Sequence, residues 1–421
     1  MWPVHPIKSV ALGIFDGPHA TPKRRESGPV FLGISSLDRG RIDLAKSDHV
    51  SEADFAKWTR RVTPGEGDLV FSYETRIGEA ASIPRGLRCC LGRRMGLVRP
   101  DPAKMDARFL LYSYLGPEFQ EVLRERTVQG STVERILLTE LPEFPIRVPP
   151  LDEQRRIATV LGALDDKIEL NRKMNRTLEE MAQAIFKSWF IDFDGHDDLV
   201  DSEIGPVPRG WEVRSLDAIA DFLNGAACQK YPATDGEPWL PVIKIRELNQ
   251  GVTAQTDRAT ATIPDKWHVR DGDVLFSWSG SLVVKVWTGG PGALNQHLFK
   301  VTSEPYPRWF YLSWVQHHLA EFQRIAADKA TTMGHIKRHH LTDAKCAVPP
   351  ADLLARVGAL LEPVVNRQVA NELESRTLAD MRDTLLPKLI SGELRVPEAE
   401  EAVGAASGPL SQYAAGEATA P

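Results

Sequence analysis

Val148-Pro149-Pro150-Leu151-Asp152-Glu153-Gln154-Arg155 opens a long segment with helical spacing. Proline suits the entrance of a helix and not its interior, so a helix is predicted to begin directly after the Pro-Pro pair and to cover 151–190. Spacings of four and three residues alternate along it, at Ile157, Leu161, Leu164, Ile168, Asn171, Asn175, Leu178, Ala182 and Ile185. This is the seam of a coiled coil with two polar interruptions.

The same pattern returns 200 residues later in the chain. Val348-Pro349-Pro350 precedes a second helical segment, and Arg176-Thr-Leu-x-x-Met181 recurs as Arg376-Thr-Leu-x-x-Met381. Further upstream, Gly67-Asp-Leu-Val-Phe-Ser72 recurs as Gly272-Asp-Val-Leu-Phe-Ser277, here with an offset of 205 residues. Matches in the same order over such distances indicate an internal duplication.

The second helix is expected over 351–395. It keeps the seam in outline, at Val357, Leu361, Val364, Gln368, Asn371, Ser375, Leu378, Arg382 and Leu385. Two helices of one chain with matching polar breaks are expected to pair with each other. Since each helix follows its own globular segment, the pair is predicted to be an antiparallel coiled coil.

Two globular segments, 1–150 and 206–350, precede the two helices. Short apolar runs such as Asp68-Leu-Val-Phe and Asp273-Val-Leu-Phe alternate there with turn-rich loops, which is typical of mixed α/β domains. The expected fold class is α+β, with two tandem α/β domains that are each followed by a long helix. The strand order stays open.

The remaining two segments are acidic. Residues 191–205 carry six acidic residues and no Lys or Arg, and we expect a linker there. Residues 396–421 carry four acidic residues and few large apolar ones, and we expect them to be disordered. The net charge of the chain is −6, so the rest of the chain is net positive, and 1–150 holds 22 Lys and Arg against 19 Asp and Glu. This distribution permits phosphate binding without demanding it.

The four cysteines, Cys89, Cys90, Cys228 and Cys346, form neither a C-x-x-C metal pair nor a disulfide framework, so reduced, buried thiols are expected. The sequence holds no run of 18 apolar residues, and its first eight residues lack the apolar core of a signal peptide. We therefore expect a cytoplasmic protein.

Polar and aromatic side chains directly follow the two matched strands. Side chains that read a DNA sequence must reach base edges, while cations hold the phosphates. DNA contacts are predicted in the first half at Ser72, Tyr73, Glu74, Thr75, Arg76, Ser131 and Thr132. In the second half they are predicted at Ser277, Trp278, Ser279, Ser281, Asn295, Gln296, His297, Thr331, Thr332, His335 and Lys337. Four further cations could fork onto guanine or clamp a phosphate: Arg93, Arg94, Lys244 and Arg246.

Each of these candidates has an ordinary alternative. A single arginine is as easily a solvated surface charge, and Glu74 could serve in a turn or a salt bridge instead of accepting from cytosine. The stretch His335–His340 suggests zinc, but without a second pair of ligands a basic, phosphate-facing loop is favoured. Residues 192–203 imitate a calcium loop in part, yet Asp197 occupies the position that requires glycine, which favours a solvated linker.

Several catalytic signatures are missing from the sequence. It contains no G-x-x-x-x-G-K-[ST] loop, no G-x-G-x-x-G, no G-x-S-x-G and no Asn-Pro-Pro-aromatic segment for gripping a flipped base. These absences disfavour an enzyme that acts unaided.

Four motifs resemble the specificity subunits of type I restriction-modification enzymes. They are Pro149-Pro-Leu-Asp-Glu-Gln-Arg155, Leu164-Asp-Asp-Lys-Ile-Glu-Leu-Asn171, Phe186-Lys-Ser-Trp-Phe-Ile-Asp-Phe-Asp194 and Gly205-Pro-Val-Pro-Arg-Gly-Trp211. The resemblance spans roughly residues 1–395. It departs from the family at Ala351-Asp-Leu-Leu354, where the family prefers Leu-x-Glu-Gln.

The resemblance implies a DNA-reading subunit without a catalytic centre. Segments 1–150 and 206–350 would be target recognition domains, each reading one half of a split DNA site, and the helices would act as the spacer. Two adenine methyltransferase subunits and an ATP-dependent restriction subunit would be the partners, and S-adenosylmethionine, ATP and magnesium would belong to them.

Five residues of the first helix are candidates for the partner interface: Glu153, Gln154, Phe186, Trp189 and Phe190. For the aromatic three, packing against the recognition domains remains an equal alternative. For the whole chain, the rival hypotheses are a helical scaffold that does not read DNA and an unaided nuclease with dispersed carboxylates.

Overall fold

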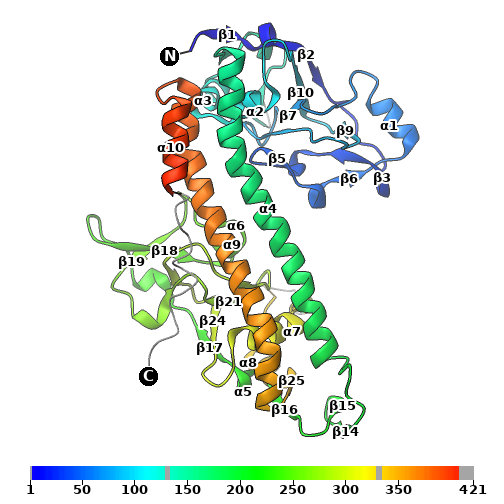
Figure 1. The fold of residues 1–421 in the computed structure, drawn as a ribbon, viewed down its shortest axis with the longest axis vertical. Helices are drawn as coiled ribbons and strands as arrows, with labels where there is room; N and C mark the ends of the chain where they lie inside the picture. Colours follow the sequence, from blue (N-terminus) through cyan, green and yellow to red (C-terminus); the bar gives the residue numbers. More distant parts are fainter. Residues whose placement is uncertain (1, 129–132, 329–333, 407–421) are drawn as a thin grey trace. The chain divides into compact units, whose positions relative to one another are not determined.

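The structure, a computed structural model, describes residues 2–128, 133–328 and 334–406 (Figure 1). It divides into two compact units. Unit 1 comprises Met1–Lys167 and Leu378–Pro421, and unit 2 comprises Ile168–Thr377. The boundaries between the units fall inside the long helices α4 (Leu151–Phe190) and α9 (Ala351–Ser391). Each unit therefore combines one globular segment with a part of both helices.

Unit 1 is built on an antiparallel sheet in the order β2-β10-β7-β8. The strands are β2 (Ala11–Asp16), β7 (Leu69–Ser72), β8 (Ala80–Ser82) and β10 (Met95–Pro100). Leu69 and Phe71 pack in the core on one face of this sheet, and Val70 packs in a second core on the other face. Because neighbouring side chains of a strand point to opposite faces, a strand buried on both sides is apolar throughout.

A second sheet of unit 1 has the order β6-β3-β9, in which β3 and β9 run parallel. Its strands are β3 (Arg25–Leu32), β6 (Asp48–His49) and β9 (Cys89–Leu91). Three two-stranded pairs complete the strands: β1 (Val4–Pro6) with β13 (Pro145–Arg147), β4 (Leu37–Asp38) with β5 (Arg41–Ile42), and β11 (Thr127–Val128) with β12 (Arg135–Ile136).

The helices of unit 1 begin where the local sequence predicts helix starts. α1 (Glu52–Trp58) follows Ser51, whose hydroxyl accepts from the Asp54 amide. α2 (Ala107–Leu115) follows Asp106, whose carboxylate accepts from the first helical amides, and α3 (Pro117–Glu125) opens on proline.

Unit 2 repeats this plan. Its antiparallel sheet has the order β17-β24-β21-β22, and a second sheet, β19-β18-β23-β20, contains the parallel pair β18 and β23. The strands are β17 (Asp221–Asn224), β18 (Trp239–Ile243), β19 (Arg258–Thr260), β20 (His268–Val269), β21 (Val274–Ser277), β22 (Val284–Val286), β23 (Gly292–Leu294) and β24 (Leu298–Thr302). β16 (Glu212–Ser215) pairs with β25 (Lys345–Val348), as β1 pairs with β13.

The main helix of unit 2, α7 (Arg308–Asp328), corresponds in position to α2 and α3 together. The shorter helices are α5 (Leu216–Ile219), α6 (Ile245–Gln250) and α8 (Arg338–Asp343). Arg108 and Arg308 begin the matching helices, and each contacts the long helix that follows its own domain: Arg108 pairs with Asp166 at 2.6 Å, and Arg308 lies 3.7 Å from Glu362. The duplication inferred from the sequence is therefore present in the strand order, the parallel pair and the helix contacts.

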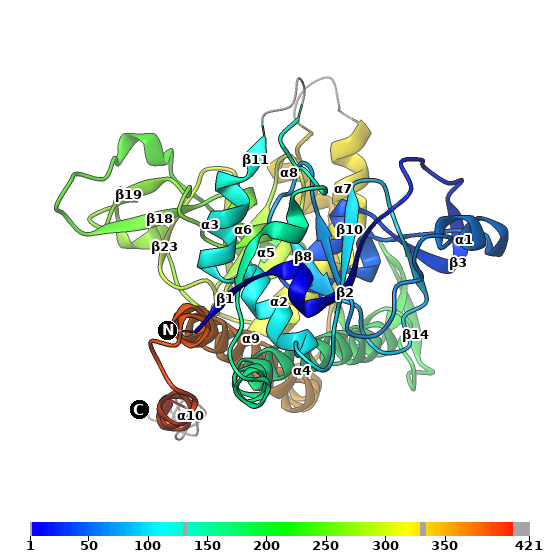
Figure 2. The same ribbon diagram turned by 90° about the horizontal axis from the view of Figure 1, so that it is seen from above.

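The two long helices lie side by side, as Figures 1 and 2 both show. In unit 1, Leu161 and Leu164 of α4 share a core with Leu385 and Leu389 of α9. In unit 2, the seam is a polar layer. Asn171 Nδ2 donates to Glu374 Oε2 at 2.8 Å, and Asn175 Nδ2 donates to the Gln368 carbonyl at 3.0 Å. Later residues of α4 thus meet earlier residues of α9, and the predicted antiparallel coiled coil is confirmed.

The asparagines of this polar layer stand at the seam positions that the heptad pattern predicts. Asn371 Nδ2 donates to Asn175 Oδ1 at 2.7 Å, and Asn171 and Asn371 are each only 1% exposed. One predicted seam position shifts: Val365, 5% exposed, is buried in place of Val364. A side chain in such a seam can lie one position away from the strict repeat, because a straight helix drifts from a seven-residue period.

The acidic segment 191–205, expected as a linker, contains most of a hairpin of β14 (Leu199–Ser202) and β15 (Gly205–Pro208). Arg209, just beyond it, pairs with Asp198 at 2.7 Å, a contact that the charge count of 191–205 alone could not reveal.

The composition of 396–421 predicts disorder, but the first part of this segment is a helix. α10 (Val396–Ala406) buries Val396 and Ala399 against the core of unit 1. Two small apolar side chains on one turn are enough to attach this helix, and composition averaged over the segment hides them. Residues 407–421 lie outside the described residues.

All four cysteines are free and buried, as expected. Burial raises the pKa of the Cys89 and Cys90 thiols to about 12, so they are not reactive thiolates at neutral pH. Within the described ranges, no helix is both long and apolar enough to cross a membrane.

Candidate nucleic-acid interface

In unit 1, three loops meet at the end of β7. The first is the loop after Ser72, whose hydroxyl donates to the Glu74 carbonyl at 2.6 Å. The second is the short connection from β9 to β10, where the Arg94 carbonyl accepts from the Tyr73 amide at 3.3 Å. The third is the start of β12, where the Ile136 amide donates to the Tyr73 carbonyl at 2.9 Å. The backbone of Tyr73 is thus held from both sides.

One side-chain pair bridges two of these loops. Arg94 Nε lies 2.6 Å from Glu74 Oε2, with the N–H not aligned for a straight hydrogen bond, and the side chains are 34% and 19% exposed. Arg93, beside this pair, is exposed. Arg76 donates to the Ile34 carbonyl and pairs with Glu79 at 2.9 Å.

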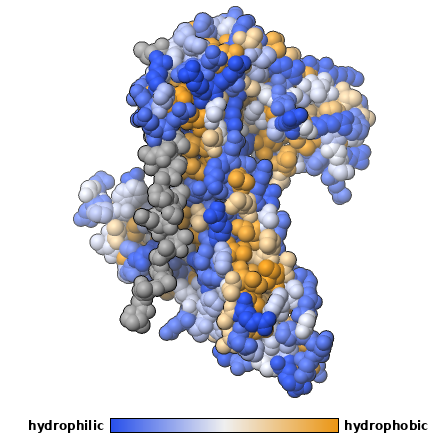
Figure 3. Space-filling view, viewed as in Figure 1, coloured by the Kyte–Doolittle hydropathy of each residue, from blue (hydrophilic) through white to orange (hydrophobic). Residues whose placement is uncertain are grey.

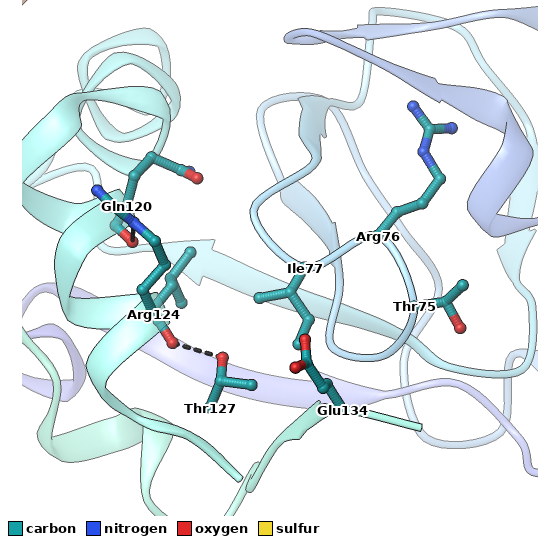
Figure 4. A pocket seen from close by; sticks show the side chains of 8 residues that line it. Thr75, Arg76, Ile77, Gln120, Arg124, Thr127 and Glu134 are labelled. Atoms are coloured by element: carbon teal, nitrogen blue, oxygen red, sulfur yellow. Dashed lines mark hydrogen bonds between the residues drawn. The ribbon is translucent and has the colours of Figure 1, made fainter. Parts of the chain in front are cut away.

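An open hollow of about 390 Å³ lies beside these loops. Thr75, Arg76 and Ile77 come from the loop after β7, and Gln120 and Arg124 face them from α3 (Figure 4). Sequence reasoning missed Gln120 and Arg124, because nothing in the sequence places α3 next to that loop. The predicted contacts Ser131 and Thr132 lie outside the described residues.

Unit 2 builds the same frame at the end of β21. The Trp278 amide donates to the His297 carbonyl at 3.4 Å, and the Ile336 amide donates to the Trp278 carbonyl at 3.0 Å. Ser279 Oγ and His297 Nδ1 lie 3.0 Å apart. Trp278 also donates from Nε1 to the Gln296 carbonyl at 3.2 Å, which fixes its ring beside the loop.

The two frames can be matched residue by residue. Tyr73 corresponds to Trp278 and Arg94 to His297, because the same amide-to-carbonyl bond joins each pair. Glu74 corresponds to Ser279, since each is the next residue and forms an isolated bridge, to Arg135 and to His335 respectively. The same backbone therefore carries a Glu–Arg pair in unit 1 and a Ser–His pair in unit 2.

Thr75 and its counterpart Gly280 show that this match extends to the backbone angles. Gly280 has φ of +65°, which glycine adopts freely, and Thr75 has φ of +69°, which strains a β-branched residue. Unit 2 shows that glycine satisfies the frame at this position. Strain of this kind is concentrated at functional sites, so the exposed Thr75 side chain is a candidate for direct contact.

Replacing Thr75 with glycine is expected to stabilise unit 1 by about 1 kcal/mol, since relief of the left-handed strain exceeds the added entropy of the unfolded chain. The matched control is Gly280→Thr, which should destabilise unit 2 by a similar amount. Urea unfolding followed by circular dichroism checks both. A Thr75→Gly variant less stable than the wild type would show that the threonine side chain supports the fold.

Several predicted contacts are buried and hold the loops instead of facing solvent. The exposed fraction is below 6% for five of them: Ser72, Tyr73, Ser277, Ser279 and Asn295. Their sequence neighbours carry the exposed groups, and direct DNA contact by these five stays a prediction. The reason for this burial is that a tight turn after a buried strand uses its first polar side chains for hydrogen bonds within the turn.

Lys244 and Arg246 lie at the end of β18, where the Ile243 carbonyl accepts from the Asn295 amide at 3.1 Å. Both have acidic partners in the fold: Lys244 pairs with Asp257, and Arg246 pairs with Glu247 at 2.7 Å. These ion pairs compete with any phosphate for the two cations.

Three further candidates of unit 2 differ in setting. Gln296 is half-buried beside His297, and Ser281 is exposed, its carbonyl accepting from Ser277 at 2.6 Å. Lys337 is exposed and immediately precedes α8, so the end of the segment predicted as a basic loop is helical. Thr331 and Thr332 lie outside the described residues.

The partner-interface candidates divide by burial. Gln154 is fully buried, accepts from the Asp106 amide at 2.9 Å and donates to two carbonyls. Phe186 and Phe190, at 5% and 1% exposure, belong to the core of unit 2. These three side chains serve the chain's own packing, which for Phe186 and Phe190 is the alternative named above, and their part in a partner interface stays a prediction. Glu153 and Trp189 stay half-buried at the helix surface.

Together, the fold and the two matched loop edges define a protein of two similar units, each with a set of loops that meet at the end of a central strand. A family described as "Type I restriction modification DNA specificity domain" matches residues 42–180. Two relatives come from Methanocaldococcus jannaschii. The type I restriction enzyme MjaIX specificity subunit is 26% identical and covers 83% of this chain and 82% of its own length. The putative type I restriction enzyme MjaX specificity subunit is 28% identical and covers 94% of both.

A solved structure supports the fold. The crystal structure of a type I restriction-modification S subunit from M. genitalium aligns with a TM-score of 0.56 at 13% identity, over 92% of this chain and 96% of that one. The resemblance stated from the sequence is thereby confirmed: over most of its length, the chain is similar to the specificity subunits of type I restriction-modification enzymes.

Proposed function

We propose that each unit reads one half of a bipartite DNA target and that the chain directs adenine methylation or cleavage by partner subunits. The observation that carries this is the matched frame at β7 and β21, which presents Glu74 and Arg94 in one unit but Ser279 and His297 in the other. Base edges are read by side chains, so two half-sites of different sequence require different side chains. The matched frames provide these on the same backbone.

The chain's own role in this proposal is binding and not chemistry. The described residues contain no group of three or more His, Cys, Asp or Glu that could hold a metal ion, and the sequence lacks the nucleotide-binding and base-flipping motifs given above. In this proposal, S-adenosylmethionine, ATP and magnesium belong to the partner subunits, and the complex acts in the cytoplasm.

The partners in this proposal are two methyltransferase subunits, which dock near the helices, and a restriction subunit. Apolar side chains reach the surface over α4 and α9 (Figure 3). Leu170, Met181 and Leu360 are 51%, 50% and 55% exposed. These exposed apolar side chains of the two helices offer a docking area that the buried Phe186 and Phe190 do not.

The test is selection from a randomised duplex library, with the chain alone and with its methyltransferase subunit, at one fixed salt concentration. Two short enriched blocks separated by a constant gap are expected. A bound fraction without enrichment in either form would instead favour the helical scaffold.

A further inference from the structure

We infer that Arg94, held by Glu74, reads a guanine in the half-site of unit 1 and that His297, held by Ser279, is the matched reader of a different base in unit 2. This inference rests on the proposed function and names the residue pair that sets one position in each half-site.

The first argument is the position of Arg94. Its carbonyl accepts from the Tyr73 amide and so ties the loop after β9 to the loop after β7. φ of Arg94 is +71°, the second strained non-glycine angle among these loops after Thr75. Two such angles in loops that meet indicate that the backbone is held in place to present particular side chains.

The second argument is the carboxylate. Glu74 lies 2.6 Å from Nε of Arg94 and is only 19% exposed, so the guanidinium is held on its Nε side. A guanidinium held in this way can present its two Nη donors together. Guanine offers O6 and N7 as a pair of acceptors in the major groove, which matches that fork. Holding the side chain beforehand also lowers the entropy lost on binding.

The third argument is the contrast with unit 2. The imidazole of His297 has no fork: Nδ1 lies 3.0 Å from Ser279 Oγ, which leaves Nε2 as a single donor or acceptor. Nε2 lies 3.5 Å from Gln296 Nε2, so a base would meet an imidazole and an amide together. This pair cannot form the bidentate contact that arginine makes with guanine.

Exchanging the two pairs tests the inference. The variants are Glu74→Ser with Arg94→His in unit 1, and Ser279→Glu with His297→Arg in unit 2. Each is assayed with the methyltransferase subunit by library selection. The unit 1 exchange should lose one guanine from one block, with discrimination at that position falling about 10- to 100-fold, and should leave the other block and the gap unchanged. The unit 2 exchange should gain a guanine in the other block.

Arg93→Ala is the matched control. Arg93 is the exposed neighbour of Arg94, and loss of a phosphate contact lowers affinity for all sequences alike and reduces the salt dependence. Glu74→Gln keeps the shape of the side chain but removes its charge, so guanine discrimination should fall even if the double exchange disturbs the fold. Thermal unfolding of each variant identifies such a disturbance.

The outcomes separate the two proposals. If the wild-type complex enriches no blocks, the proposed function fails. If it enriches two blocks, and both the unit 1 exchange and Glu74→Gln leave them unchanged, only the Arg94 reading is overturned.

Discussion

Phe190→Ala is expected to destabilise unit 2 by about 3–5 kcal/mol, the usual cost of removing a buried aromatic side chain. The Phe190 ring is 1% exposed and lies 5.1 Å from Phe186, 5.6 Å from Trp211 and 5.8 Å from Trp309, centroid to centroid. The side chain therefore joins the end of α4 to the recognition domain that follows it.

Urea unfolding followed by tryptophan fluorescence measures this effect. Of the ten tryptophans, only Trp2 and Trp58 lie in unit 1, so the signal reports mainly on unit 2. Leu170→Ala, on an exposed position of the same helix, is the control and should change stability by less than about 0.5 kcal/mol. A Phe190→Ala chain of normal stability that no longer binds the methyltransferase subunit would favour the interface interpretation instead.

Acid is expected to destabilise unit 2 through His318. Burial, together with the neighbouring His317, lowers the pKa of the His318 imidazole to about 4, although the hydrogen bond to the Lys345 carbonyl and the charge of Glu321 oppose the shift. The ring lies 5.8 Å from Trp314, and Nε2 is 2.9 Å from the Lys345 carbonyl. The burial of the ring therefore favours the neutral imidazole over the charged form, and the carbonyl only partly offsets this preference.

The direction of the pH effect follows from the lowered pKa. An unfolded histidine binds its proton below pH 6.5, whereas the folded one resists protonation down to about pH 4. The contribution of His318 to the free energy of unfolding is fully present above pH 6.5 and is lost as the pH falls towards 4. The stability lost by pH 5 is about 2 kcal/mol.

The comparison is between the wild type and His318→Gln, each unfolded in urea at pH 7 and pH 5. The glutamine amide can still donate to the Lys345 carbonyl but does not titrate. The loss of stability on going to pH 5 should be smaller by about 2 kcal/mol in the variant. Equal losses in both proteins would show that His318 is protonated in the folded state at pH 5.

The long helices and their antiparallel pairing could be predicted from the sequence, because a heptad seam is a local pattern and the Pro-Pro pairs mark both starts. The loops after Ser72 and Ser277 were also found, since each directly follows a matched apolar strand. The burial of the first polar side chains in these loops could not be predicted. It depends on contacts from the loop after β9 and from β12, which are distant in the sequence.

The match of Arg94 to His297 could not be predicted for a related reason. The sequence repeat has offsets of 200 and 205 residues, whereas these two residues are 203 apart. Insertions or deletions between the repeated motifs therefore give Arg94 and His297 neither of the two offsets. Only the matching hydrogen bonds, from the Tyr73 amide to Arg94 and from the Trp278 amide to His297, identify the two residues as equivalent. α10 was missed because two buried side chains do not alter the average composition of an acidic tail.

The composition of the two units determines when each can be completed on the ribosome. Unit 2 needs the chain only as far as Thr377, whereas the core of unit 1 includes Leu385, Leu389 and Ile390, almost 400 residues after its first strand. Domains commonly fold in the order of synthesis, N-terminal first. Here the N-terminal domain keeps part of its apolar core uncovered until the end of α9 has been synthesised, so a chain that terminates before α9 is complete would expose these apolar side chains to solvent.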